Sequence, residues 1–451
     1  MPGNRQPPNR SVPREQPVLI LSRDAVAAAL LGGLVETLGY HVHFASPPES
    51  AEDSVRRVKP RICLIDCTDP LACRSEFLGR ATMRGVSVLI YGTREALDRV
   101  REVAKAHDLE TLLMIPDLFH YFFTGIKANE LTDASTTQLY DPTARRWSYE
   151  LLKDFGLPPH LLGTLVAPGT VLGPLRSQVA TETGVNPVPV IAPASHDTGS
   201  AVAAVPAQGQ SWAYISSGTW SLMGVEIKEP LINEKTLQFN FTNEGGVGGT
   251  IRLLKNIMGL WLVQECRRAW GRAGHSYSYE ELARLAEAAP PFASLIDPDH
   301  SSFILPANMP AAIAEFCRRT GQATPVEPGA VIRCTLESLA LRYRWVLERL
   351  EELVGHRLDV IHIVGGGSQN ILLCQLTADA CNRPVLAGPV EATAIGNVLM
   401  QAVGLGILGS LADGREVVRR SFELQTYSPR NSECWEGPYE RFLGHLISGN
   451  N

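Results

Sequence analysis

The first hundred residues alternate between short apolar runs and segments with the spacing of a helix. The apolar runs, rich in Val, Ile and Leu, stand at 18–22, 41–45, 61–66 and 86–92. The helical patterns stand at 24–39, 48–58 and 94–107. This alternation predicts a small doubly wound parallel sheet, which we place at residues 17–111. The preceding segment, 1–16, is rich in Pro, Asn and Arg and is expected to be a disordered tail.

From residue 112 onward the pattern changes to a mixture of strands and helices. The stretch "SWAYISSGTWSLMGVEI" predicts two strands around a Ser-Ser-Gly-Thr turn. Further on, "VIRCTLESLALRYRWVLERLEELVG" has the period of a long amphipathic helix, and "DVIHIVGGGSQN" predicts a strand that enters a glycine turn. The small residues of "EATAIGNVLMQAVG" favour a closely packed helix. This part is therefore expected to be a mixed α/β, enzyme-like fold.

One further stretch, "RLLKNIMGLWLVQECRRAW", is interpreted as a single apolar helix. Two polar residues interrupt it, Asn256 and Gln264, which would lie two turns apart and about 80° round the helix axis. They would face either water or a ligand, and periodicity does not choose between the two.

Composition narrows the classes of function. A chain of 451 residues exceeds the size of one core, so two or three domains are expected. The net charge of -6 argues against nucleic acid as a partner, and no apolar stretch approaches the ~20 residues of a membrane span. Nine scattered cysteines, without metal-ligand spacing, favour a reducing cytoplasm, and whether Cys317 and Cys334 meet is left open. Nothing in the sequence specifies an oligomeric state.

The stretch "ASHDTGSAV" carries the first candidate for chemistry. Asp197 follows an apolar run and precedes small residues, a position typical of a helix N-cap. The same edge of a sheet is also where a general base meets its ligand. The neighbouring His196 and Thr198 would supply donors to hydroxyl groups, so that sugar binding is one of the functions the stretch allows.

Two glycine-containing turns are candidates for a phosphate or nucleotide site. In "ISSGTWSL", the small residues before Thr219 would let the backbone approach a phosphate, although an ordinary hairpin turn explains them equally well. In "IVGGGSQN", three glycines separate a strand from a helix start, where amide dipoles favour an anionic ligand. A structural turn needs one or two glycines, so the third favours ligand binding.

The N-terminal stretch "RICLIDCTDP" resembles the third strand of a response-regulator receiver domain. In such a domain the strand-end aspartate, here Asp66, would accept a phosphoryl group. The likeness is incomplete, because the acidic pair after the first strand is reduced to Asp24 and the usual Lys after the fifth strand is absent. A structural aspartate at a strand end is the alternative reading.

Six stretches taken together resemble the rhamnulokinase branch of the FGGY carbohydrate kinases, within the actin-like, ribonuclease H-like superfold. They are "ASHDTGSAV", "SSGTWSLMG", "TNEGG", "LKNIMGLWL", "HIVGGGSQN" and "AGPVEATAIGN". The resemblance runs from about residue 112 to the C-terminal region. It implies transfer of the γ-phosphate of ATP to L-rhamnulose, with magnesium bridging the phosphates.

The resemblance also implies roles for individual residues. Asp197 matches the catalytic base of the family, and the sugar contacts match His196, Thr198 and Asn256. The ATP contacts match Thr219, Gln264 and Gly366. Apart from the base, these residues would position the substrates and stabilise charge, because phosphoryl transfer depends mainly on these two effects.

This chain departs from the family at its N-terminal side. Rhamnulokinases begin with a glycine-rich Asp-x-Gly phosphate loop, and this sequence has the receiver-like segment instead. We therefore expect a partial first kinase domain at 112–207 and a complete second one at 208–451. An alternative function is a catalytically impaired fusion of a receiver-like domain with a sugar- or nucleotide-binding remnant, whose exposed apolar interior a partner would have to cover.

Overall fold

The N-terminal strands form one parallel sheet in a computed structural model that describes residues 17–22, 25–37, 40–45, 49–66, 77, 86–91 and 111–448. The strand order is β2-β1-β3-β4, the order of the flavodoxin-like doubly wound sheet, and every pair is parallel. Its elements are β1 (Pro17–Leu21), α1 (Ala25–Thr37), β2 (His41–Phe44), α2 (Ala51–Val58), β3 (Ile62–Asp66) and β4 (Ser87–Tyr91). The predicted alternation is confirmed as far as β4, and the helix expected at 94–107 lies outside the described residues.

This sheet shares a core with the segment that follows it. Leu118 and Phe122 of α5 (Ile115–Thr124) belong to the same buried apolar cluster as Val18 of β1 and Leu64 of β3. The apolar interior that was expected to need an external partner is thus covered in part by the chain's own N-terminal sheet. Because burial of such side chains drives folding, the sheet and α5 stabilise each other.

The segment after α5 consists of small strand pairs and short helices: β5 (Ala128–Glu130), α6 (Leu131–Ala134), β6 (Tyr140–Asp141), β7 (Arg146–Trp147), α7 (Tyr149–Phe155), β8 (Thr164–Val166), β9 (Thr170–Pro174), α8 (Ser177–Thr183), β10 (Pro189–Ala192) and α9 (Asp197–Ala203). The pairs are β5 with β8, β6 with β7, and β9 with β10. The strand expected before Asp197 is β10, and the small residues after Asp197 do form a helix.

A seven-stranded sheet organises the rest of the chain, in the order β13-β14-β12-β11-β15-β16-β17. Its strands are β11 (Trp212–Ser217), β12 (Trp220–Ile227), β13 (Thr242–Gly245), β14 (Ile251–Met258), β15 (Val360–Val364), β16 (Val385–Ala387) and β17 (Gln425–Tyr427). The predicted hairpin is β11 and β12, which pair antiparallel, while β11, β15 and β16 run parallel.

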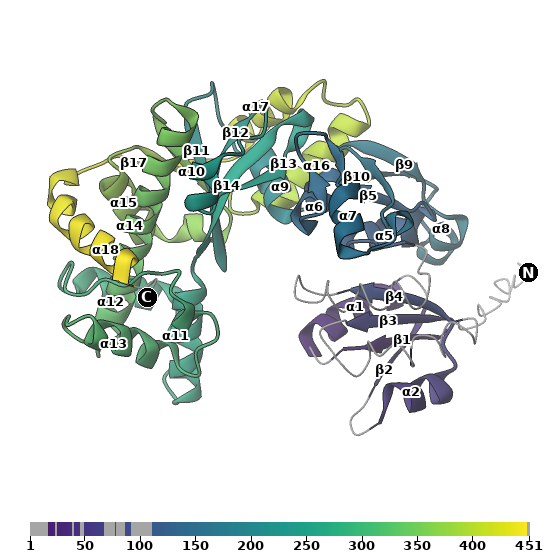
Figure 1. Ribbon diagram of the computed structural model, residues 1–451, viewed down its shortest axis with the longest axis horizontal. Coiled ribbons are helices and arrows are strands. Elements are labelled where there is room, and N and C mark those ends of the chain that lie inside the picture. The colour runs from purple at the N-terminus through teal and green to yellow at the C-terminus, as the bar shows by residue number, and fades with distance from the viewer. Residues whose placement is uncertain are drawn as a thin grey trace, which may run out of the picture.

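Helices cover both faces of this sheet (Figure 1). The largest core cluster joins the sheet to the long α14 (Pro328–Val354), as predicted, and to neighbouring helices. On the other face, α9 and α16 pack together against β11. The remaining helices are α10 (Glu234–Gln238), α11 (Trp261–Arg272), α12 (Tyr279–Ala288), α13 (Met309–Arg319), α15 (Ile371–Cys381), α16 (Ala392–Gly404), α17 (Leu411–Ser421) and α18 (Glu436–Ser448).

One predicted helix is wrong. The stretch "RLLKNIMGLWLVQECRRAW" is a strand followed by a helix: β14 ends at Met258 and α11 begins at Trp261. The break falls at Gly259, where a side chain would lie 2.7 Å from the backbone nitrogen of Ser221. Because β14 lies between two other strands and is buried on both faces, it lacks the alternation that would have identified it as a strand.

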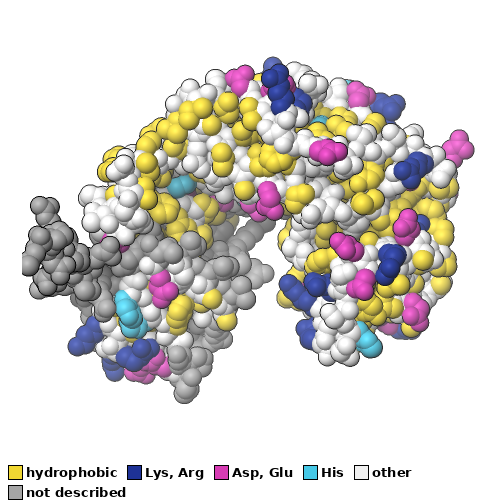
Figure 2. Space-filling model, turned by 180° about the vertical axis from the view of Figure 1, so that it is seen from behind, with side chains coloured by type: hydrophobic (Ala, Val, Ile, Leu, Met, Phe, Trp, Pro, Cys, Tyr) yellow, Lys and Arg dark blue, Asp and Glu magenta, His cyan; other side chains and the backbone are white. Residues whose placement is uncertain are grey.

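Surface charge agrees with the composition. On the face shown in Figure 2, the described Lys and Arg side chains are interspersed with Asp and Glu and do not form a continuous basic patch. Within the described residues no helix is long and apolar enough to cross a membrane. The described cysteines are free thiols, and those of Cys317 and Cys334 lie within hydrogen-bond reach of each other.

Candidate active site

A cavity of about 590 Å³ collects residues that are far apart in the sequence. The start of α9, the β11–β12 turn, β14, the turn after β15 and the start of α16 all contribute to its wall. Six of the residues singled out from the sequence line it: His196, Asp197, Thr198, Thr219, Asn256 and Gly366. These residues come together although neither composition nor periodicity could place them side by side.

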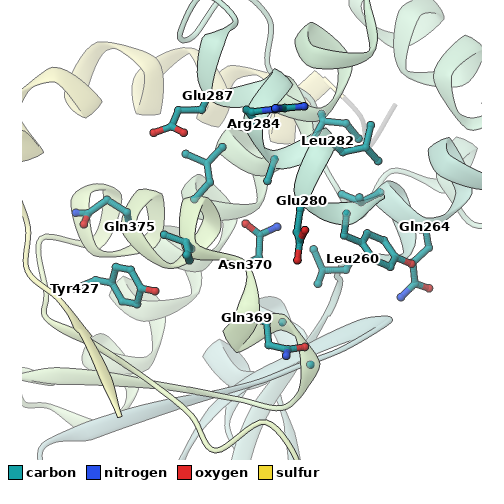
Figure 3. A pocket seen from close by; sticks show the side chains of 18 of the residues that line it. Leu260, Gln264, Glu280, Leu282, Arg284, Glu287, Gln369, Asn370, Gln375 and Tyr427 are labelled. Carbon is teal, nitrogen blue, oxygen red and sulfur yellow. The ribbon is translucent and has the colours of Figure 1, made fainter. Parts of the chain in front are cut away.

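A second cavity, of about 740 Å³, adjoins the first, and Figure 3 shows residues that line it. Gln264 lines it, and in Figure 3 this side chain lies at one side of the cavity and Tyr427 at the other. The two cavities share Gly218 and Gly366, so they meet at the two glycine turns. Thr219 and Gln264 are in direct contact, because the Thr219 hydroxyl donates to Gln264 Oε1 at 3.2 Å.

Asp197 is open to the smaller cavity, with 80% of its side chain exposed. It is the first residue of α9, whereas the cap position is taken by His196, which makes no side-chain cap bond. Asp197 Oδ1 accepts a hydrogen bond from the adjacent Thr198 amide at 2.6 Å. The interpretation of Asp197 as an N-cap is therefore wrong by one residue, and its carboxylate is accessible to a ligand.

The loop that carries Asp197 is held by hydrogen bonds to the last residue of β5 and to α6. Glu130 accepts a hydrogen bond from the Ser195 amide at 2.8 Å, and the Thr132 hydroxyl accepts one from the His196 amide at 3.1 Å. Glu130 is fully buried, and burial raises the pKa of its carboxyl. These bonds fix the backbone of the two residues that precede Asp197. Glu130 and Thr132 therefore determine where the Asp197 carboxylate lies.

Another buried acid, Asp133, lies beside this network. Burial, followed by the nearby charges of Asp117 and Glu130, raises the pKa of Asp133 to about 7. Its Oδ2 atom has no hydrogen-bond partner among the described residues. A carboxyl in such surroundings is stabilised in its protonated form.

The side chain of His196 is in contact with a buried ion pair. Its Nδ1 lies 3.3 Å from Arg252 Nη2, and its Nε2 lies 3.7 Å from Asp197 Oδ1. Arg252 is paired with Glu244 at 3.1 Å and has no exposed surface. Burial, assisted by the charge of Arg252, lowers the pKa of His196, so the imidazole is neutral at pH 7.

The three glycines after β15 have different surroundings. A side chain at Gly365 would lie 2.8 Å from the Ser217 carbonyl oxygen, and one at Gly367 would lie 2.6 Å from Ser217 Cβ. These two glycines let the turn pack against β11. A side chain at Gly366 would meet no atom within 4 Å, and this residue lines both cavities. The residue assigned to the nucleotide is thus the one that packing does not require to be glycine.

Asp66 lies apart from this site. It stands at the end of β3, is buried and accepts a hydrogen bond from the Ser22 hydroxyl at 2.7 Å. It lines neither cavity. The partner residue Asp24, which the receiver resemblance singled out, lies outside the described residues.

Sequence reasoning did not identify the supporting residues Glu130, Thr132, Glu244 and Arg252. "TNEGG" was singled out as a stretch, but no role was given to its glutamate. Arg252 stood inside a stretch interpreted as a helix, which hid its position on β14 opposite Glu244 of β13. The signal that could have found them is a buried charge, and burial is visible only in the fold.

Comparison with known proteins agrees with the fold. Models of the FGGY family of carbohydrate kinases match residues 96–204 with the N-terminal domain and residues 213–405 with the C-terminal domain. A xylulose kinase from Lactobacillus acidophilus has a TM-score of 0.61 at 12% identity, covering 84% of this chain and 78% of its own. A glycerol kinase from Plasmodium falciparum, solved with ADP, has a TM-score of 0.55 at 15% identity, covering 74% and 65%.

The relatives found by sequence have a much higher identity to this chain than these two structures. A rhamnulokinase from Bacteroides thetaiotaomicron is 47% identical over 374 residues, which are 82% of this chain and 75% of that protein. A rhamnulokinase from Pectobacterium carotovorum is 45% identical over 339 residues, 74% of this chain and 66% of that protein. The chain therefore belongs to the FGGY family of carbohydrate kinases, and within it to the rhamnulokinases.

Proposed function

We propose that this chain transfers the γ-phosphate of ATP to L-rhamnulose, giving L-rhamnulose 1-phosphate. The observation that carries the proposal is the meeting of two cavities at Gly218 and Gly366. Residues assigned to the sugar line the smaller cavity, and Gln264, assigned to ATP, lines the larger one. A nucleotide in the larger cavity would reach toward Asp197 through the shared glycine turns.

Asp197 acts as the general base in this proposal. Its exposed carboxylate takes the proton of the sugar hydroxyl as the oxygen attacks the phosphorus, and the bond to the β-phosphate oxygen breaks. His196, Thr198 and Asn256 hold the sugar by hydrogen bonds from the same cavity wall. Each of these bonds restricts the orientation of the attacking hydroxyl, which is a large part of catalysis in phosphoryl transfer.

The nucleotide is held by the glycine turns and by α11. The Thr219 hydroxyl and the Gln264 amide, already in contact with each other, can turn toward phosphate and nucleoside groups. Mg²⁺ prefers phosphate oxygens, waters and one or two carboxylates, and this cavity wall contains Asp197 and Glu391. The donor set fits a magnesium ion bound mainly by ATP, where it would neutralise charge on the phosphates.

We retain the domain division as part of the proposal: a tail at 1–16, a receiver-like sheet at 17–111, a partial first kinase domain at 112–207 and a second at 208–451. The strand order of the N-terminal sheet supports a receiver-like fold. The buried position of Asp66 favours a structural role for it over phosphorylation. We expect the reaction to take place in the cytoplasm, on the basis of the cysteine content.

The test is ADP release from ATP and magnesium in the presence of L-rhamnulose. Asp197→Asn should abolish sugar-dependent release, because an amide cannot accept the proton, while the circular dichroism spectrum stays unchanged. Asp154→Asn is the matched control, since Asp154 is an exposed residue of α7 that lines neither cavity. A wild-type chain that releases no ADP with L-rhamnulose, or an Asp197→Asn variant that keeps its rate, would contradict the proposal.

A further inference from the structure

Arg252 occupies an unusual place for an arginine, because it is fully buried on β14, an interior strand of the seven-stranded sheet. Its Nε donates to the Gly245 carbonyl at 2.9 Å, which fixes the plane of the guanidinium. Its Nη2 lies between two groups, Glu244 Oε2 at 3.1 Å and His196 Nδ1 at 3.3 Å. The guanidinium therefore connects the "TNEGG" strand to the loop that carries Asp197.

The chemistry of these atoms decides where the imidazole proton lies. A guanidinium has five N–H donors and no acceptor, so its contact with His196 requires Nδ1 to be the acceptor. A neutral imidazole that accepts at Nδ1 carries its proton on Nε2. Glu244 Oε2 lies 3.9 Å from the same Nδ1, beyond hydrogen-bond distance, so it does not compete for the ring.

We propose that Arg252 and Glu244 are positioning residues that hold His196 as the Nε2–H tautomer, with that N–H directed at Asp197 and at the incoming sugar hydroxyl. Nε2 lies 3.7 Å from Asp197 Oδ1, on the side of the ring opposite Arg252. The inference rests on the proposed function, in which His196 contacts the sugar. Glu244 acts through Arg252, because it balances the buried charge that keeps the guanidinium in place.

The consequence for catalysis is a donor of fixed direction beside the base. With its proton on Nε2, His196 donates to a sugar oxygen and leaves Asp197 free to accept the hydroxyl proton. With the proton on Nδ1, the ring would instead present a lone pair at Nε2, which would repel the carboxylate and compete with it for the hydroxyl proton of the sugar. Arg252 excludes that tautomer, since two donors cannot face each other.

Nitrogen-15 spectra of the histidine side chains test the tautomer without any need for activity. In protein labelled with ¹⁵N-histidine at pH 7, the His196 ring, assigned from its absence in His196→Gln, should show an unprotonated Nδ1 and a protonated Nε2. In Arg252→Lys we expect a mixture of tautomers, because lysine cannot reach both the Gly245 carbonyl and the ring with a rigid fork. A protonated Nδ1 in the wild type overturns the inference.

Kinetics supply the second measurement. Arg252→Lys and Glu244→Gln should each raise the KM for L-rhamnulose by roughly 2- to 10-fold, which corresponds to the loss of one hydrogen bond between the neutral imidazole and the sugar. The KM for ATP should stay within about twofold, which loss of a purely structural contact would not predict. Arg383→Lys is the matched control: its Nε also donates to a carbonyl and its Nη2 to a carboxylate, but it lines neither cavity.

The outcomes separate this inference from the proposed function. If the wild type is inactive but His196 is in the Nε2–H form, the proposed function is overturned and the inference about the tautomer stands. If the wild type is active but neither Arg252→Lys nor Glu244→Gln changes the KM for L-rhamnulose, the inference is overturned and the proposed function stands. If one variant fails to fold, the other variant and the wild-type spectrum still decide.

Discussion

Replacement of Gly396 by alanine should separate the two helices on which the proposed site is built. Gly396 lies in α16 where this helix crosses α9, and a side chain there would lie 2.6 Å from the Ser200 carbonyl carbon and closer still to its oxygen. Both atoms belong to backbone, so no flexible side chain can turn aside. The helices must move apart to accommodate one methyl group.

The size of the effect follows from two opposing terms. Overpacking of a closely packed contact costs about 1–3 kcal/mol, and alanine in place of glycine inside a helix returns up to about 1 kcal/mol. A helical glycine without neighbours shows the second term alone. Gly271 in α11 is such a residue, since a side chain there would meet nothing within 4 Å. Gly271→Ala should therefore be neutral or stabilising by up to about 1 kcal/mol, and Gly396→Ala destabilising.

Urea denaturation followed by circular dichroism compares the two variants directly. Gly396→Ala should have the lower midpoint at an unchanged slope. Because α9 begins at Asp197, a shift of about 1 Å should also lower kcat by up to about 100-fold, whereas Gly271→Ala keeps its activity. Equal midpoints for the two variants would refute the contact between α16 and α9, and with it the argument that small residues are needed there.

The glycine turn and the buried acid give two more predictions. Gly366→Ala should keep the unfolding midpoint and raise the KM for ATP, whereas Gly367→Ala should lower the midpoint because of Ser217; the reverse pattern would contradict the assignment. Asp133 has its pKa raised to about 7 from 3.8, so the folded state binds the proton more tightly than the unfolded state, and stability falls as pH rises from 3.8 to about 7 and stays low above it. Asp133→Asn should remove this loss, up to roughly 4 kcal/mol at 1.36 kcal/mol per pKa unit, and a variant no more stable than wild type at pH 8 relative to pH 4 would disprove it.

Regular elements with a clear period could be predicted from the sequence. The strands β1 to β4, the β11–β12 hairpin and the long α14 all appear where the pattern placed them. The strand that contains Asn256 could not be predicted in this way. A strand buried on both faces lacks the alternation of apolar and polar residues that distinguishes a strand from a buried helix, and only the pairing of β14 with β12 and β13 identifies it.

The residues of the proposed site divide in the same way. Asp197 and Gly366 stand in stretches whose wording resembles a family, and the resemblance, not the local pattern, selected them. Arg252 and Glu130 could not be found, because their role depends on contacts with residues 56 and 65 positions away in the chain. Such contacts are decided by tertiary packing, which no local period records.

Because Asp197 is exposed, the proposed mechanism requires the bound substrates to shield its carboxylate from water. A general base that remains in water is less effective, because water screens the charges that guide phosphoryl transfer. The cavity leaves 80% of the Asp197 side chain exposed, although His196 beside it is nearly buried. In the proposed mechanism the sugar must therefore cover the carboxylate on one side, and the nucleotide phosphates must cover it on the other, near Gly218 and Gly366. Desolvation of the base would be complete only with both substrates bound, which ties proton transfer to the presence of the phosphoryl donor.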